Sequence, residues 1–336
     1  MYLTSDKVVV MGAAGAIGSN LVQSLLSSGT AHHIAMYDPF AAGLEGAAEE
    51  VWHCGFPDAR LSFTTDVAEA LDGARFLISA GGAPRKEGMT REDLLKGNCE
   101  IAKGLGEDIA RYAPGCQFAT VIFNPADITG LTALVWSGLE PGRVSTLAAL
   151  DSTRLQTALA QHFHVLPDQV TGCATYGGHG EQMAVFKGDI KVDGVPLNEI
   201  LNTEAEANGR RMTRKQWDAI KELVRGGGAR IIKLRGRSSF QSPAQQSIFM
   251  LRGFLGERYR LPCGTYCDRD PYHHVMMAMP TYFGGKGLEW HKPDGDEEDM
   301  AALNTSYAHV SKLRDEVIAM GLLPPISDWH KVNPNL

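Results

Sequence analysis

The sequence predicts an α/β fold in which a doubly wound parallel sheet, built from residues 1–150, is followed by an α+β domain over residues 151–336. Three observations lead to this prediction. Short apolar runs alternate with segments of helical periodicity through the first 150 residues, which is typical of a parallel sheet with helices on both faces. From about Asp151 this alternation gives way to a mixed order of helices, strands and a hairpin. The 336 residues, 44% of them hydrophobic, suffice for two domains.

In the first domain, strands are expected where apolar and β-branched residues cluster. The expected strands are Lys7–Met11, His32–Tyr37, Leu61–Thr64, Phe76–Ala80, Phe118–Phe123 and Arg143–Leu147. Helices are expected where apolar residues recur at helical spacing between these strands. The expected helices are Ile17–Leu26, Gly43–His53, Thr90–Tyr112 and Ala126–Trp136.

The second domain is expected to open with a helix at Asp151–Phe163 and a strand at Gln169–Tyr176. A hairpin is expected within residues 187–194. The remaining expected elements are helices at Thr213–Val224 and Pro243–Gly253, strands near Tyr259–Tyr266 and Val275–Phe283, and a last helix at Glu297–Met320.

A glycine-rich turn follows the first expected strand. Gly12, Gly15 and Gly18 are spaced three apart, directly after a β-branched run. Gly12 permits a tight turn, Gly15 lets phosphates approach the main chain, and Gly18 lets the following helix pack closely, as in a Rossmann domain. The sequence therefore predicts a dinucleotide site along the whole turn, which consists of Gly12, Ala13, Ala14, Gly15, Ala16, Ile17 and Gly18.

An acidic residue ends the second expected strand. Asp38 lies twenty residues after Gly18, and no Arg or Lys follows it until Arg60. A carboxylate at this point binds the ribose hydroxyls of NAD and repels the 2′-phosphate of NADP. The predicted cofactor is therefore NAD.

Composition excludes several classes of partner. A net charge of −7 argues against nucleic acid or an anionic membrane as a partner, because both attract a basic surface. No apolar run approaches the ~20 residues of a membrane span, and the first strand begins too early to leave room for a signal peptide. The six scattered cysteines are expected to be reduced thiols of a cytoplasmic protein, and we expect no metal site.

Four polar segments follow expected strands or begin the second domain. They are the loop 81–93 with Arg85 and Arg91, the amide Asn124, the pair Asp151 and Arg154 at helical spacing, and His179 between glycines. Alone, each also has an ordinary structural interpretation: a solvated loop, a turn, a surface ion pair, a structural histidine.

Together, the four segments match the needs of a dehydrogenase that oxidises a secondary alcohol with NAD. His179 would be the base, Asp151 the carboxylate that orients it, and Arg91 and Arg154 the cations that polarise the carbonyl oxygen and hold the substrate's anionic end. The arginine-bearing loop could close over a small anion and exclude water.

With these motifs in order, the chain resembles the lactate/malate dehydrogenase family over nearly its full length. The motifs are Gly-Ala-Ala-Gly-Ala-Ile-Gly, Asn-Pro-Ala-Asp, Leu-Asp-Ser-Thr-Arg and Gly-Gly-His-Gly. The resemblance implies reversible NAD-dependent oxidation of malate to oxaloacetate, a step of the tricarboxylic acid cycle, by a homo-oligomer (dimer or tetramer). It also implies His179 and Asp151 as the acid/base pair.

The resemblance further assigns substrate and cofactor contacts. Arg154 would grip the C1 carboxylate and Arg91 would polarise the C2 oxygen. Arg85 falls where the malate-specific members carry the arginine for the second carboxylate. The remaining implied contacts are Asn124 with substrate and nicotinamide, Ile122 and Asn98 with the cofactor, and Ser238 in the pocket wall.

Two alternatives stay open. A short-chain dehydrogenase shares the glycine spacing but needs Tyr-x-x-x-Lys on a helix, and the one match, Tyr282 to Lys286, contains two glycines and follows Pro280. A NAD-sensing module without catalysis would not need His179 or Asp151. The chain departs from the family pattern in Gly-Glu-Gln-Met-Ala-Val-Phe after His179, in the run 226–228 and in the tail after Leu323.

Overall fold

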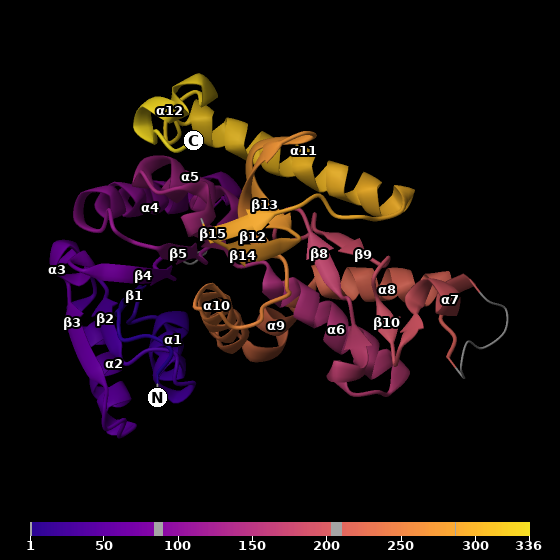
Figure 1. Cartoon of the computed structure of the whole chain (residues 1–336), viewed down its shortest axis with the longest axis horizontal. Helices are drawn as coiled ribbons and strands as arrows, with labels where there is room; N and C mark the ends of the chain where they lie inside the picture. Colours follow the sequence, from indigo (N-terminus) through magenta and orange to yellow (C-terminus); the bar gives the residue numbers. More distant parts are fainter. Residues whose placement is uncertain (1, 84–89, 203–209, 286) are drawn as a thin grey trace.

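The computed structural model describes residues 2–83, 90–202, 210–285 and 287–336, with the side chains of Arg91 and Asn202 excepted. Its centre is an eight-stranded sheet in the order β13-β12-β6-β5-β4-β1-β2-β3 (Figure 1). Six strands are parallel and come from the N-terminal half: β1 (Lys7–Met11), β2 (His33–Tyr37), β3 (Arg60–Thr64), β4 (Ala74–Ser79), β5 (Phe118–Val121) and β6 (Val144–Thr146). The predicted doubly wound sheet is confirmed.

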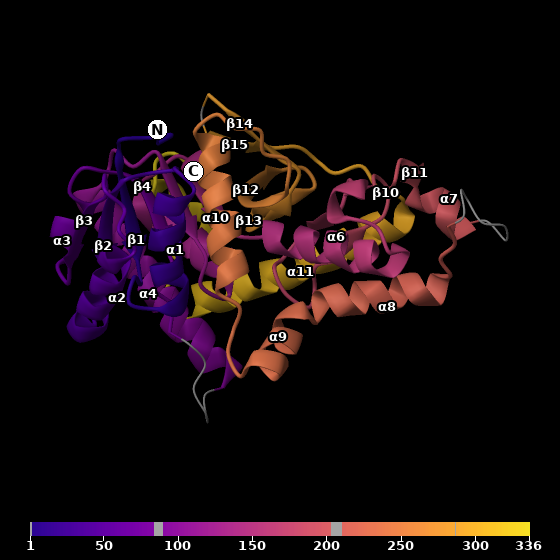
Figure 2. The ribbon, with the colours of Figure 1, turned by 90° about the horizontal axis from the view of Figure 1, so that it is seen from below.

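Helices cover both faces of this sheet. One face carries α1 (Ala16–Ser27), α2 (Ala41–His53) and, from the C-terminal half, α10 (Gln241–Phe254), which lies along α1 (Figure 2). The other face carries α4 (Arg91–Tyr112) and α5 (Ala126–Ser137). The short α3 (Val67–Leu71) was not predicted, because one turn is too short to show periodicity; Asp66 caps it by accepting the N–H of Ala68 at 2.8 Å.

The sheet does not end where the first predicted domain ends. Strands β12 (Cys263–Arg269) and β13 (Tyr272–Met279) extend it as an antiparallel pair beyond β6. At Gly264 a side chain would overlap Thr146, so the absent side chain lets β12 approach β6 closely. Strands expected within the second domain thus cover an edge that the short β6 would otherwise leave unpaired.

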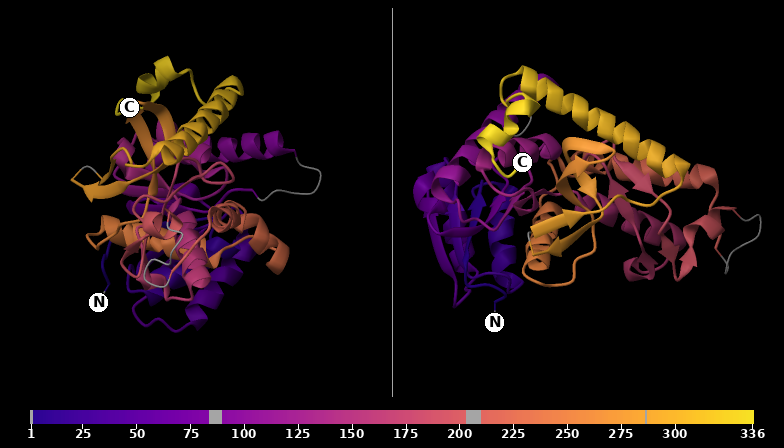
Figure 3. Two further views of the ribbon diagram at one scale, coloured as in Figure 1. Left: turned by 90° about the vertical axis from the view of Figure 1, so that its right-hand side faces the viewer. Right: turned by 45° about the horizontal axis from the view of Figure 1, so that its top comes forward.

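The C-terminal half also forms a smaller layer beside the sheet. Its helices are α6 (Ala149–Phe163), α7 (Leu197–Asn202), α8 (Arg214–Arg225), α9 (Gly227–Arg235) and α11 (Glu297–Ala319), while α12 (Trp329–Val332) packs on α5. Its strands are β7 (Val170–Thr171), β8 (Ala174–Tyr176), β9 (Ala184–Phe186), β10 (Lys191–Val192), β11 (Val195–Pro196), β14 (Thr281–Gly284) and β15 (Gly287–Trp290). Helix α11 lies across both layers and contacts α5 and β13 of the first and β9 of the second (Figure 3).

Three predicted elements of this half differ in the structure. The single strand expected at Gln169–Tyr176 is two strands, since Gly172 between them has φ +72°. The hairpin turns at Asp193 and Gly194, both at positive φ, so it joins β10 to β11 rather than filling 187–194. The strand expected at Val275–Phe283 is interrupted at Pro280, which has no N–H to donate.

The cysteines of the chain are unpaired thiols. All six cysteines are free, and burial raises the pKa of the Cys99 and Cys116 thiols to about 12, so these two stay protonated. Within the described residues no helix has the length and apolar character to cross a membrane. The same residues contain no group of three or more His, Cys, Asp or Glu side chains arranged to hold a metal.

Candidate active site

The glycine turn between β1 and α1 has the predicted backbone. Gly12 has φ +78°, and a Cβ there would lie 2.6 Å from the Cα of Gly81. A Cβ on Gly18 would overlap the Gly12 carbonyl, so its absence lets α1 pack on the turn. The turn is tied to β2 by the N–H groups of Gly12 and Ala13, which donate to the Tyr37 carbonyl at 2.9 and 3.0 Å. The conformational roles expected of Gly12 and Gly18 are confirmed.

Asp38 lies at the end of β2 and faces the same turn. Its carboxylate accepts the N–H of Ala14 at 3.2 Å and that of Phe40 at 3.0 Å. At the neighbouring start of α1, Gly15 is the N-cap and supplies no side chain to bind the first helical N–H groups. The turn thus offers open backbone donors for a pyrophosphate beside a carboxylate for ribose hydroxyls, and it fits a dinucleotide.

A charged triplet lies where α6 meets the segment after β8. Asp151 Oδ2 is 2.6 Å from His179 Nδ1, and Asp151 Oδ1 accepts a hydrogen bond from Arg154 Nη1 at 2.8 Å. The Asp151 side chain is only 2% exposed, whereas those of Arg154 and His179 are 18% and 17% exposed. A buried carboxylate therefore orients two partly open side chains, one a base and one a cation.

The electrostatics of the triplet favour a protonated histidine. The charge of Asp151 and its hydrogen bond raise the pKa of His179, and the charge of Asp127 adds to this; burial and Arg154 act in the opposite direction. A histidine with a raised pKa can hold a proton near neutral pH and release it when the charges around it change.

Backbone contacts hold His179 in place. The preceding Gly177 exchanges two hydrogen bonds with Ala278 of β13, at 2.9 and 2.8 Å, and has φ +82°. Ser306 of α11 accepts the N–H of Gly178 at 2.8 Å. Gly180, with φ +136°, follows the histidine. The central sheet and α11 thus fix the main chain on which the imidazole is carried.

The carboxyl ends of β4 and β5 are joined by Asn98 of α4. Its Nδ2 donates to the carbonyls of Asn124 at 2.6 Å and Ala83 at 3.2 Å, and its Oδ1 accepts the Ala83 N–H at 2.8 Å. Asn98 is buried, while Asn124 is exposed at the start of α5 and Ile122 is buried just before it. The structure therefore brings Asn98 and Asn124 together and uses the Asn98 amide to position backbone.

Helix α9 packs against Arg154. A Cβ on Gly227, the first residue of α9, would lie 2.9 Å from Arg154 Cδ and 3.1 Å from its Nε. The unusual glycine run noted in the sequence thus makes room for the guanidinium stem. The structure assigns no partner to Arg154 Nε among the described residues.

The structure adds a residue that the sequence did not single out. Asp127, in the first turn of α5, accepts the main-chain N–H of His179 at 2.7 Å. Asp127 ends the Asn-Pro-Ala-Asp motif quoted above, where no role was assigned to it, and the signal that could have identified it is an acid in a buried, mostly apolar helix.

Three predicted residues remain outside this cluster. Arg85 lies outside the described residues, as does the side chain of Arg91, which begins α4. Thr90 and Asp93 there form a capping box, with each side chain accepting the other's N–H at 3.0 Å. Ser238 is exposed between α9 and α10, and its place in a pocket wall stays a prediction.

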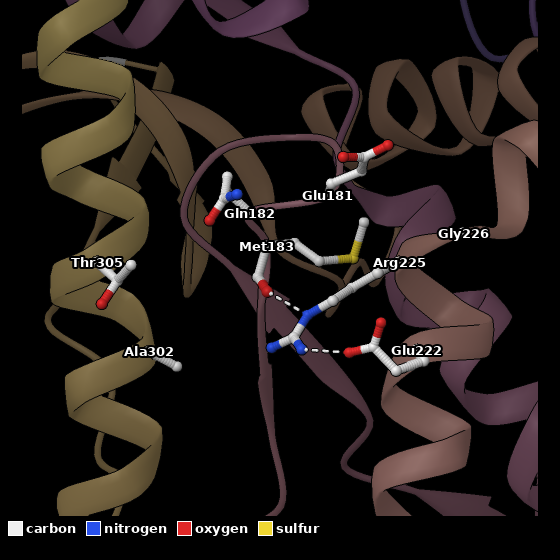
Figure 4. A pocket seen from close by; sticks show the side chains of 8 residues that line it. All are labelled: Glu181, Gln182, Met183, Glu222, Arg225, Gly226, Ala302 and Thr305. Atoms are coloured by element: carbon white, nitrogen blue, oxygen red, sulfur yellow. Dashed lines mark hydrogen bonds and ion pairs between the residues drawn. The ribbon is translucent and has the colours of Figure 1, made fainter.

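A cavity of about 520 Å³ borders the segment that follows His179 (Figure 4). It is lined by residues 181–183, α8 and α11, and Arg225 crosses one wall, donating to the Met183 carbonyl at 3.3 Å and to Glu222 at 2.9 Å. Neither His179 nor Asp151 lines it, so it is separate from the triplet.

Two family models match the chain. One describes a lactate/malate dehydrogenase NAD binding domain and matches residues 6–146; the other describes the alpha/beta C-terminal domain of the same enzymes and matches residues 148–317. A malate dehydrogenase of Symbiobacterium thermophilum is 34% identical over 270 residues, which cover 79% of this chain and 81% of the relative.

Two solved structures from Cryptosporidium parvum have the same fold. Its malate dehydrogenase has a TM-score of 0.84 at 25% identity and covers 94% of this chain and 100% of that one. Its lactate dehydrogenase, solved with lactic acid and β-nicotinamide adenine dinucleotide, has a TM-score of 0.83 at 25% identity, with coverages of 93% and 98%.

Proposed function

This chain belongs to the lactate/malate dehydrogenase family of NAD-dependent oxidoreductases, and we propose that it interconverts malate and oxaloacetate with His179 and Asp151 as the acid/base pair. The observation that carries the proposal is the buried Asp151 carboxylate bonded to both His179 and Arg154.

This contact determines which nitrogen of His179 exchanges the proton with the substrate. Because Nδ1 of His179 is engaged by Asp151 at 2.6 Å, Nε2 is the nitrogen left to accept the proton from the C2 hydroxyl of malate. Asp151 stabilises the imidazolium that results and holds the ring in one orientation. In the reverse direction the same nitrogen returns the proton to the C2 oxygen of oxaloacetate.

The other residues bind and orient the substrate. Arg154, held by Asp151, would clamp the C1 carboxylate with two parallel hydrogen bonds, and Arg91 would polarise the C2 oxygen. Asn124 would contact the substrate from the end of β5. The residues that would hold NAD are the turn Gly12–Gly18, Asp38, Ile122 and Asn124, with Asn98 acting beside them. When bound, NAD accepts the hydride from C2.

The choice of malate over lactate rests on the malate dehydrogenases among the relatives and on Arg85 in the sequence. The second carboxylate of oxaloacetate is costly to bury in a closed site unless a cation meets it. A guanidinium can meet it with two hydrogen bonds.

Substrate comparison with an arginine variant tests the proposal. NADH oxidation should be fast with oxaloacetate and slow with pyruvate. Arg85→Gln should lower kcat/KM for oxaloacetate by at least about thirtyfold, which corresponds to the loss of one partner of a buried charge pair. The value of kcat/KM for pyruvate should not fall. The control, Arg91→Gln, should lower kcat/KM for both substrates. Equal losses for both substrates in Arg85→Gln would remove the case for malate.

We also propose four remaining features. The family resemblance suggests a homo-oligomer (dimer or tetramer) and a role in the tricarboxylic acid cycle. The scattered cysteines suggest a cytoplasmic location, and the change of pattern after residue 150 suggests that residues 1–150 bind the cofactor and residues 151–336 the substrate. Sedimentation of the purified protein tests the first of them.

A further inference from the structure

We propose that Asp127 is a positioning residue: it holds the main chain of His179 and, by its negative charge, favours the protonated imidazole. The inference rests on the proposed function, in which His179 carries the proton. It adds a second buried carboxylate to the one that already bonds the ring.

The geometry links Asp127 to the histidine directly. Oδ2 of Asp127 accepts the His179 N–H at 2.7 Å, from the first turn of α5. Asp127 is 5% exposed. The bond joins α5 to the segment after β8, 52 residues further along the chain. A displacement of this turn of α5 would therefore move the main chain that carries the imidazole.

A purely structural role does not account for the charge. Oδ1 of Asp127 has no hydrogen-bond partner among the described residues, and no cation is bonded to this carboxylate there. A buried, incompletely paired carboxylate destabilises a fold, and a neutral Asn or Ser could accept a single N–H as well. A destabilising charge beside a candidate catalytic histidine points to an electrostatic role.

Among the described residues, three charged side chains act on the imidazole. Asp151 and Arg154 approach it from α6, and Asp127 acts on it from α5. The neighbouring α11 and β13 contribute Ser306, Leu303, Val310 and Ala278 around Gly177 and Gly178, and none of these four titrates. Burial raises the pKa of Asp127 to about 6, and the charge of His179 opposes that rise. At pH 7 and above, Asp127 is therefore mostly ionised and acts as an anion on His179.

The sign of the expected effect follows. Removing the negative charge at Asp127 makes the imidazolium less stable and lowers the pKa of His179. Malate oxidation needs neutral His179, so the acid limb of the pH profile of kcat/KM for malate should move to lower pH. Oxaloacetate reduction needs protonated His179, so the alkaline limb of the profile for oxaloacetate should move to lower pH as well. A nearby charge shifts a pKa by about 1 unit or more, which sets the size of both movements.

The test compares pH profiles of kcat/KM in both directions for the wild type, Asp127→Asn and Ser306→Ala. Asp127→Asn keeps an oxygen for the His179 N–H and removes the charge. Ser306→Ala removes the hydrogen bond to Gly178 and changes no charge, so it disturbs the same segment without the electrostatic effect. Asp127→Ser, a smaller neutral residue with room for a water, is made alongside and covers the case in which the amide does not pack.

A downward shift of about 1 pH unit in both limbs, in Asp127→Asn or Asp127→Ser and not in Ser306→Ala, supports the proposal. The proposal is overturned if the limbs of the neutral Asp127 variants lie at the wild-type pH, or if Ser306→Ala shifts them equally. Failure of the proposed function is distinct, because the wild type itself would then show no turnover of malate or oxaloacetate.

Discussion

Replacing Asp151 by Asn is the most direct test of the charged triplet. The carboxylate makes two charge-assisted contacts, at 2.6 Å to His179 Nδ1 and 2.8 Å to Arg154 Nη1, while only 2% of its side chain is exposed. An amide has one oxygen and one NH₂ group, so it can accept from the histidine or the arginine but not from both.

The size of the effect follows from these contacts. Loss of one partner of a buried charge pair costs about 2–5 kcal/mol, which is on the order of 30- to several-thousand-fold in rate. Because the imidazolium also loses its counter-charge, kcat should fall together with kcat/KM. The KM for oxaloacetate should rise as well, since Arg154 loses the carboxylate that aligns it for the substrate.

The assay is NADH absorbance during oxaloacetate reduction, across substrate concentrations and pH. Asp168→Asn, the same change at an exposed carboxylate, is the matched control and should stay at the wild-type rate. A kcat for Asp151→Asn within about threefold of wild type would show that the pair is structural only, because acid/base catalysis contributes about 10²–10⁴-fold.

Three further predictions follow from the site. His179→Asn should lower kcat by about 10²-fold or more while NADH fluorescence titration shows unchanged cofactor binding; retained turnover would exclude His179 as the base. Because the pKa of His179 is raised, the pH profiles of kcat/KM should have their midpoint above 6.5. Across that midpoint kcat/KM for malate should rise with pH and kcat/KM for oxaloacetate should fall. Opposite slopes would contradict the assignment of His179. Asp38→Asn keeps an acceptor for the Ala14 N–H but removes the charge, so the preference for NAD over NADP in kcat/KM should narrow about tenfold; equal use of both cofactors by the wild type would refute the role of Asp38.

Local patterns predicted the parts of the site that depend on short stretches of chain. The positive φ at Gly12 and the close packing at Gly18 follow from the glycine spacing. The contact between Asp151 and Arg154 follows from a spacing of three in a helix. In each case the partners lie within one turn or one element, so periodicity suffices.

Contacts between distant segments could not be predicted from such local patterns. Strand β12 joins β6 across more than a hundred residues, and the bond from Asp127 to His179 links α5 to the segment after β8. No local propensity encodes which edge a strand pairs with, or which N–H a buried carboxylate reaches. The breaks at Gly172 and Pro280 are different, since both residue types interrupt strands and were readable in the sequence.

The far end of α5 has a practical consequence for handling the protein. Asn333 donates to the carbonyls of Leu134 and Leu139 at 2.9 Å, and Asn335 donates to that of Gly138 at 2.9 Å. The last residues of the chain thus satisfy the carboxyl end of the helix whose first turn carries Asp127. Removing residues 333–336 would leave these carbonyls without their donors, so variants made for kinetic work should keep them.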